Sequence, residues 1–180
     1  MNEMNLPDLI IKRYKLLLDF RDTVWKDLSD PSFNQDWFIK RPSEHQWSID
    51  ELLRHMLASE IRYIQQSVDD SIDQHPFGVR AQWVGKIFFR LEELEHVSMK
   101  ELKELYPVVE KKSLEIFQKM TEEDFLQIVR APWGQDLPYI DLLEVYFAHE
   151  HAHRGQVKFL ITNYRGLPEF IPKDENVEYG

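Results

Sequence analysis

Two histidines four residues apart, His149 and His153, are the residues of this chain whose type and spacing point most directly to chemistry. Apolar residues recur around them, from residue 139 to residue 164, at the i, i+3, i+4, i+7 spacing of an amphipathic helix. Both imidazoles fall beside its buried stripe, one turn apart, where such a pair can bind one metal ion without distorting the backbone. The alternative, two core histidines, requires a separate buried partner for each ring. The spacing therefore favours a metal site.

The elements that must position these residues are amphipathic helices. Four segments carry the pattern: residues 7–28, 48–64, 98–120 and 139–164. Ser48 with Glu51 three residues later is the capping-box arrangement that starts a helix. Four amphipathic helices predict an all-α fold. Because their connections are long rather than short, we predict an antiparallel four-helix bundle with at least one crossover. The bundle domain would span residues 1–166 and a tail residues 167–180, while residues 71–90 would form short helical turns.

Facing helices of such bundles supply the ligands of metal sites. His55, on the second helix, is the natural third ligand for His149 and His153, and three histidines leave a coordination position open for water or substrate. Taken alone, His55 would be a partly exposed helix histidine. Glu60 lies near the middle of the same helix's apolar stripe, so its carboxylate must face a polar cavity or a bonded partner.

Composition limits the classes of function. With 180 residues, 43% of them hydrophobic, the chain is long and apolar enough for one globular domain. The absence of cysteine excludes disulfides, thiolate metal sites and a cysteine nucleophile. A formal net charge of -10 disfavours nucleic acid as a partner. No apolar run approaches the roughly 18 residues of a membrane span, and the N-terminus lacks a signal-peptide pattern, so we expect no membrane partner and a cytoplasmic protein.

Several residues follow one another in an order typical of a known family. A histidine follows a tryptophan-containing loop, and much later in the chain a His-x-x-x-His pair leads into Arg-Gly-Gln. The residues are Trp47, Ser48, Glu51, Leu52, His55, His149, His153, Arg154, Gly155 and Gln156. Over about residues 7–166 the chain resembles the DinB/YfiT-like superfamily of metal-binding four-helix bundles. Members often have a histidine where Ala152 stands here, but that residue is not a ligand in the matched pattern.

The resemblance implies a divalent metal ion, zinc or nickel, bound by His55, His149 and His153 in a homodimeric protein. Relatives with assigned roles include metal-dependent transferases and isomerases that use a low-molecular-weight thiol, such as bacillithiol or mycothiol, and metal-dependent hydrolases. The expected function is therefore that of a metal-dependent enzyme, a hydrolase or a thiol S-transferase, with a small-molecule substrate.

An ion held by three neutral imidazoles keeps its full charge, so it lowers the pKa of a bound water or thiol and yields a nucleophile near neutral pH. General acid–base help would come from Glu60 or Glu150. Two alternatives stay open. His149-Glu150-x-x-His153 also matches the zincin peptidase pattern, although only acids of the tail would supply its third ligand downstream. The other alternative is a non-catalytic metal- or ligand-binding sensor that works as a dimer.

Overall fold

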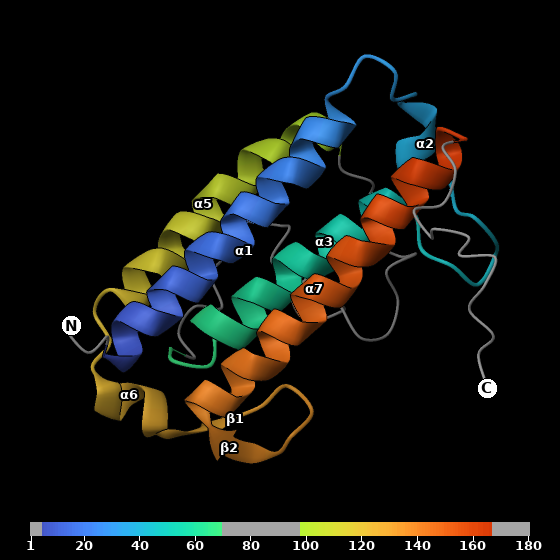
Figure 1. The fold of residues 1–180 in the computed structure, drawn as a ribbon. Coiled ribbons are helices and arrows are strands. Elements are labelled where there is room, and N and C mark those ends of the chain that lie inside the picture. Colours follow the sequence, from blue (N-terminus) through green and yellow to red (C-terminus); the bar gives the residue numbers. More distant parts are fainter. Residues whose placement is uncertain (1–4, 70–97, 167–180) are drawn as a thin grey trace, which may run out of the picture.

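The computed structural model describes residues 5–69 and 98–166, in which four long helices pack into one bundle (Figure 1). Those helices are α1 (Leu6–Leu28), α3 (Ile49–Glu60), α5 (Met99–Phe117) and α7 (Tyr139–Tyr164). The shorter elements are α2 (Asp36–Ile39), the π-helical turn η1 (Ile61–Gln65) that continues α3, α6 (Glu122–Leu126), and an antiparallel hairpin of β1 (Ile128–Arg130) and β2 (Asp136–Pro138). The predicted helical bundle is confirmed, with this small hairpin added. Residues 71–90 and the tail, residues 167–180, lie outside the described residues.

Each long helix has one parallel and one antiparallel neighbour. Helix α1 lies beside α5 and α7, and α3 lies beside the same two helices. Ion pairs of Arg13 with Glu144 and of Asp27 with Lys158 show that α1 and α7 run in the same direction. Helices α3 and α5, which follow one another in the chain, also run in the same direction. Because two consecutive parallel helices require a crossover, the predicted crossover lies between α3 and α5.

Local side-chain caps explain where several helices begin. The predicted capping box is present at α3: the Glu51 N–H donates to the Ser48 hydroxyl at 3.2 Å, and the Ser48 N–H donates to the Glu51 carboxylate at 2.8 Å. Ser98 and Thr121 cap α5 and α6 in the same way. After α7, Gly166 has a φ of 63°, a left-handed conformation that favours glycine and ends the helix.

The core consists of two apolar clusters separated by a polar layer. One cluster includes Trp25 and Leu57, and the other, toward the opposite end of the bundle, includes Ile10 and Phe117. We call the layer between them the Arg21 network. Its members are Arg21, Glu60, Glu110, Glu150, Tyr146, Tyr14 and Ser113, and all except Glu110 are buried. All four long helices contribute to this network. None of the described helices is both long and apolar enough to span a lipid bilayer.

Candidate metal centre

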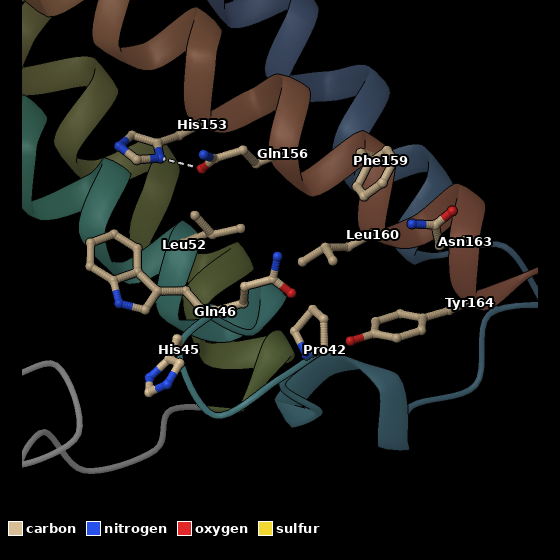
Figure 2. A pocket seen from close by; sticks show the side chains of 11 residues that line it. Pro42, His45, Gln46, Leu52, His153, Gln156, Phe159, Leu160, Asn163 and Tyr164 are labelled. Atoms are coloured by element: carbon tan, nitrogen blue, oxygen red, sulfur yellow. Dashed lines mark hydrogen bonds between the residues drawn. The ribbon is translucent and has the colours of Figure 1, made fainter. Parts of the chain in front are cut away.

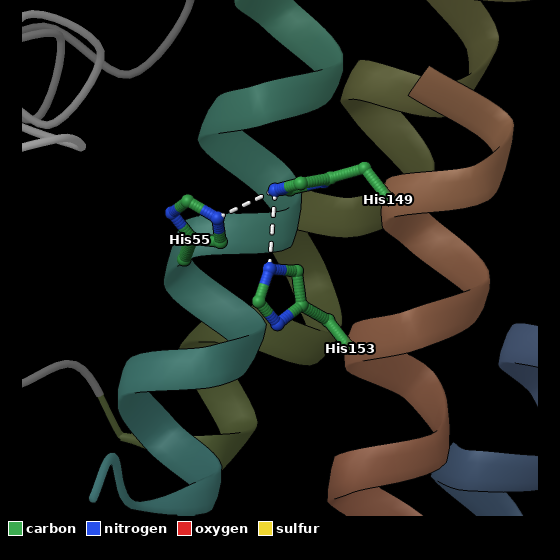
Figure 3. Close-up of side chains that lie close together, drawn as sticks. All are labelled: His55, His149 and His153. Carbon is green, nitrogen blue, oxygen red and sulfur yellow. Dashed lines mark hydrogen bonds between the residues drawn. The ribbon is translucent and has the colours of Figure 1, made fainter. Parts of the chain in front are cut away.

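The three histidines singled out from the sequence meet between α3 and α7 (Figure 3). His55 comes from α3, while His149 and His153 stand one turn apart on α7. Nε2 of His149 lies 2.8 Å from Nε2 of His55 and 3.1 Å from Nε2 of His153. One nitrogen from each ring lies within 4.8 Å of the other two. The partly exposed position considered for His55 alone is wrong, because only 4% of this residue is exposed.

This geometry suits an ion better than hydrogen bonds among the rings. A ring nitrogen offers either one hydrogen or one lone pair, yet Nε2 of His149 faces two other ring nitrogens. A single divalent ion would engage all three lone pairs, and tetrahedral zinc with its usual bond lengths separates its ligand nitrogens by about 3.3 Å. The two separations that involve His149, 2.8 and 3.1 Å, are close to that value, and one nitrogen of each ring lies within 4.8 Å of the other two. The residues therefore fit zinc or a divalent ion of similar size.

Burial keeps two of the imidazoles neutral. Removal from water, with smaller contributions from His149 and His153, lowers the pKa of His55 to about 3. Burial, with His153 as the neighbouring ring, lowers the pKa of His149 to about 4. Near neutral pH both rings are therefore uncharged and offer a free lone pair, which is the form of histidine that binds metal ions.

Two aromatic side chains pack against the histidines. The ring of Trp47, in the loop before α3, has its centroid 4.9 Å from that of His55 and stacks on His153 at 5.9 Å. The Tyr63 ring stacks on His149, also at 5.9 Å. Tyr63 belongs to the π-helical turn η1. Such turns are rare in proteins, and those that occur are often found at functional sites. The sequence does not point to Tyr63, because its contact with His149 joins two helices that are far apart in the chain.

A pocket of about 420 Å³ opens beside His153 (Figure 2). Its lining residues are Pro42, His45, Gln46, Trp47, Leu52, His153, Gln156, Phe159, Leu160, Asn163 and Tyr164. Within the described ranges, this lining combines aromatic rings, aliphatic side chains and amides, and it includes no Asp, Glu, Lys or Arg. The sequence does not reveal this pocket, because its walls come mainly from the loop before α3 and from the end of α7, which meet only in the folded protein.

Glu60 and Glu150, the candidates for acid–base roles, both bind Arg21. The Arg21 Nε donates to Glu150 at 2.6 Å, and Nη1 donates to Glu60. Glu60 also accepts hydrogen bonds from Tyr14, Ser113 and Tyr146. Among residues 5–69 and 98–166, neither carboxylate hydrogen-bonds to the three imidazoles, and Oε2 of Glu150 is buried without a partner. Their catalytic roles stay predictions.

Glu110 is the third carboxylate that faces the guanidinium, with Oε1 3.2 Å from Nη1 of Arg21. Burial raises the pKa of Glu110 to about 7; attraction to Arg21 opposes this rise, and repulsion by Glu60 and Asp22 adds to it. One guanidinium therefore faces three carboxylates, and the network has excess negative charge whenever all three are ionised. Arg21 itself stays charged, because its acidic neighbours raise its pKa despite burial.

The fold and the site together define a four-helix bundle with a three-histidine cluster between two of its helices. The profile of the DinB superfamily matches residues 22–157, and the chain belongs to this superfamily, as the resemblance implied. Among solved structures, a DinB-like protein from Bacillus subtilis, YjoA, is similar over 89% of this chain and 94% of its own, with a TM-score of 0.61 and 17% sequence identity. At that identity the likeness shows the fold alone. No curated protein sequence matches this chain significantly.

Proposed function

We propose that this protein is a metal-dependent enzyme that acts on a small molecule, as a hydrolase or a thiol S-transferase. The convergence of Nε2 atoms from His55, His149 and His153 is the observation that carries the proposal. A divalent ion bound there, zinc or nickel, would lower the pKa of a bound water or thiol and so supply a nucleophile near neutral pH. Because the chain has no cysteine, an attacking sulfur would have to come from a low-molecular-weight thiol.

The number of ligands favours catalysis over a purely structural or sensory role. In the part of the chain that the structure describes, the cluster contains three residues able to bind an ion. Three protein ligands leave a coordination position open, whereas a structural ion usually has four. Packing of Trp47 and Tyr63 against the imidazoles limits the access of water to the faces of the rings.

The pocket beside His153 is where the substrate would bind. Small-molecule sites are mostly apolar concavities with a few polar groups that fix orientation. Here rings such as those of Trp47 and Tyr164 offer apolar contact, and amides such as that of Asn163 offer hydrogen bonds. Such a lining suits an uncharged part of a small molecule.

A zincin peptidase is the less favoured alternative. Its general base would be Glu150, but only 1% of this residue is exposed and its carboxylate accepts from Arg21 at 2.6 Å. The residue that completes the cluster is His55, which precedes the His149–His153 pair and lies on another helix. Both observations favour a bundle-type metal site.

Metal analysis followed by a reaction panel tests the proposal. The protein and its His55→Ala variant would be purified with added zinc and nickel, dialysed and analysed for bound metal. We expect a bound ion in the wild type and its loss in the variant, while His151→Ala, on the exposed face of the same helix, keeps it. Metal-loaded protein would then be assayed with several thiols and electrophiles, and with esters and amides.

The outcomes of these experiments distinguish the proposed enzyme from its alternatives. A wild-type protein that retains no zinc or nickel would overturn the proposal. A metal-loaded protein that is inactive in every assay would favour the sensor alternative. We also propose that the protein is a homodimer, as the family resemblance implies, and a sedimentation experiment that gives the mass of one chain would contradict this.

A further inference from the structure

His153 differs from the other two histidines because its second ring nitrogen has a partner in the protein. Nδ1 of His153 lies 2.7 Å from Oε1 of Gln156, which follows it by three residues on α7 (Figure 2). The corresponding Nδ1 atoms of His55 and His149 are buried and have no hydrogen-bond partner among the described residues. One ring of the cluster is thus oriented by a side chain that is not itself a ligand.

The position of the hydrogen on His153 follows from the geometry. A ring nitrogen that binds a metal ion must present its lone pair, so ligation through Nε2 places the hydrogen of the neutral ring on Nδ1. Nδ1–H then donates to the Gln156 oxygen. On the face of the ring, Trp47 stacks with an interplanar angle of 25°. The hydrogen bond with Gln156 and the stacked indole together direct Nε2 toward Nε2 of His149, 3.1 Å away.

We propose that Gln156 is a positioning residue for the metal centre: its amide oxygen selects the metal-binding tautomer of His153 and fixes the orientation of the ring. This inference rests on the proposed function only as far as metal binding. Some residues hydrogen-bond to the far nitrogen of a metal-binding histidine. Their mutation typically lowers metal affinity by about 10- to 100-fold. Because Gln156 also lines the pocket, the same side chain links the pocket to the metal centre.

Titration with Co²⁺ alone, followed by its ligand-field absorption, tests the role of Gln156. Gln156→Leu removes the acceptor at similar size and is expected to weaken Co²⁺ binding by about 10- to 100-fold and to change the absorption spectrum. Gln156→Glu keeps an acceptor oxygen and is expected to bind Co²⁺ at least as tightly as the wild type. Asn163→Leu is the matched control, because Asn163 lines the same pocket from the same helix, and among the described residues the hydrogen-bond partner of Nδ1 of His153 is Gln156 and not Asn163.

The possible results separate this inference from the proposed function. Equal Co²⁺ affinity of Gln156→Leu and the wild type would overturn the inference, and so would equal losses in Gln156→Leu and Asn163→Leu. His55→Ala is included as a separate test of the proposed function. An unchanged Co²⁺ affinity in that variant would show that the three histidines do not form the metal site. Nitrogen NMR of the zinc-loaded wild type gives an independent readout: we expect the hydrogen of His153 on Nδ1, and finding it on Nε2 would refute the proposal.

Discussion

Replacing Glu110 by Gln is expected to stabilise the protein above neutral pH and to leave it unchanged in acid. The Glu110 side chain is 19% exposed and belongs to the Arg21 network. Burial disfavours its charge, Arg21 attracts it, and Glu60 and Asp22 repel it, with the net result that its pKa is raised to about 7. Glutamine keeps the shape of the side chain and an oxygen that accepts from Arg21, but it has no charge.

The sign and size of the effect follow from the pKa of Glu110. The ordinary value for glutamate is 4.5, so between pH 4.5 and about 7 the folded chain binds more protons at this position than the unfolded chain does. The stability that neutral Glu110 contributes is therefore fully present below pH 4.5 and is lost as the pH rises through about 7. Each tenfold change in proton affinity is worth about 1.4 kcal/mol, so the full loss has an upper limit of about 3 kcal/mol.

Urea unfolding at a series of pH values, from about 4 to about 8, measures this effect. The free energy of unfolding of Glu110→Gln minus that of the wild type is expected to rise from near zero in acid to at most about 3 kcal/mol. Glu104→Gln, on an exposed position of the same helix, is the matched control and should follow the wild type. A difference that does not change with pH, or a Glu110→Gln variant less stable than the wild type at pH 8, would refute the reasoning, because attraction to Arg21 would then outweigh burial and repulsion.

Two further predictions concern the metal ion and two glycines, Gly155 inside α7 and Gly166 just after it. Zinc at about 100 times its dissociation constant should stabilise the wild type by about 2.7 kcal/mol in thermal unfolding and leave His55→Ala unchanged; equal shifts in both proteins would contradict the site. Gly155→Ala should stabilise the metal-free protein by about 0.5–1 kcal/mol, because the position is helical and a new methyl group meets no atom within 4 Å. Gly166→Ala should instead destabilise it by about 1 kcal/mol, because its φ is 63°. Urea unfolding compares the two, and effects of the same sign would count against this account.

Local signals explain why the helices and the histidine cluster were predictable. The Ser48–Glu51 capping box lies within four residues of chain, and the pattern from residue 139 to residue 164 matches α7 at both ends. Helix α5 ends at Phe117, close to the expected residue 120. His149 and His153 share a helix face by their spacing alone, so the sequence needed only one further ring from a facing helix to complete the cluster.

Long-range contacts explain what could not be predicted. The position of Arg21 in α1 does not reveal that acids from three other helices face its guanidinium. Tyr63 of η1 stacks on His149 of α7, a contact between two helices that are far apart in the sequence. The hairpin strands are three residues long, too short for alternation of apolar and polar residues to be recognised. Each of these features depends on tertiary structure rather than on a local pattern.

The Arg21 network offers a physical reason why the histidines of two helices stay in register. Arg21 binds Glu150, which is next to His149 on α7, and Glu60, which follows His55 by five residues on α3. One guanidinium therefore holds the two helices that carry the histidine cluster at the same height in the bundle. A slip of one helical turn would displace a ligand by about 5.4 Å, far more than metal coordination tolerates.

Substitutions in the Arg21 network can distinguish its effect on the register of α3 and α7 from its effect on the stability of the protein. Arg21→Met alone should cost about 3–5 kcal/mol in urea unfolding, because it leaves buried carboxylates without their cation. Replacing Arg21, Glu60 and Glu150 together by Met should restore much of the stability, since apolar replacement of buried ion pairs is often neutral or stabilising. If the network sets the register, this stable triple variant still binds Co²⁺ more weakly than the wild type. Wild-type Co²⁺ affinity in the triple variant would show that apolar packing alone aligns α3 with α7.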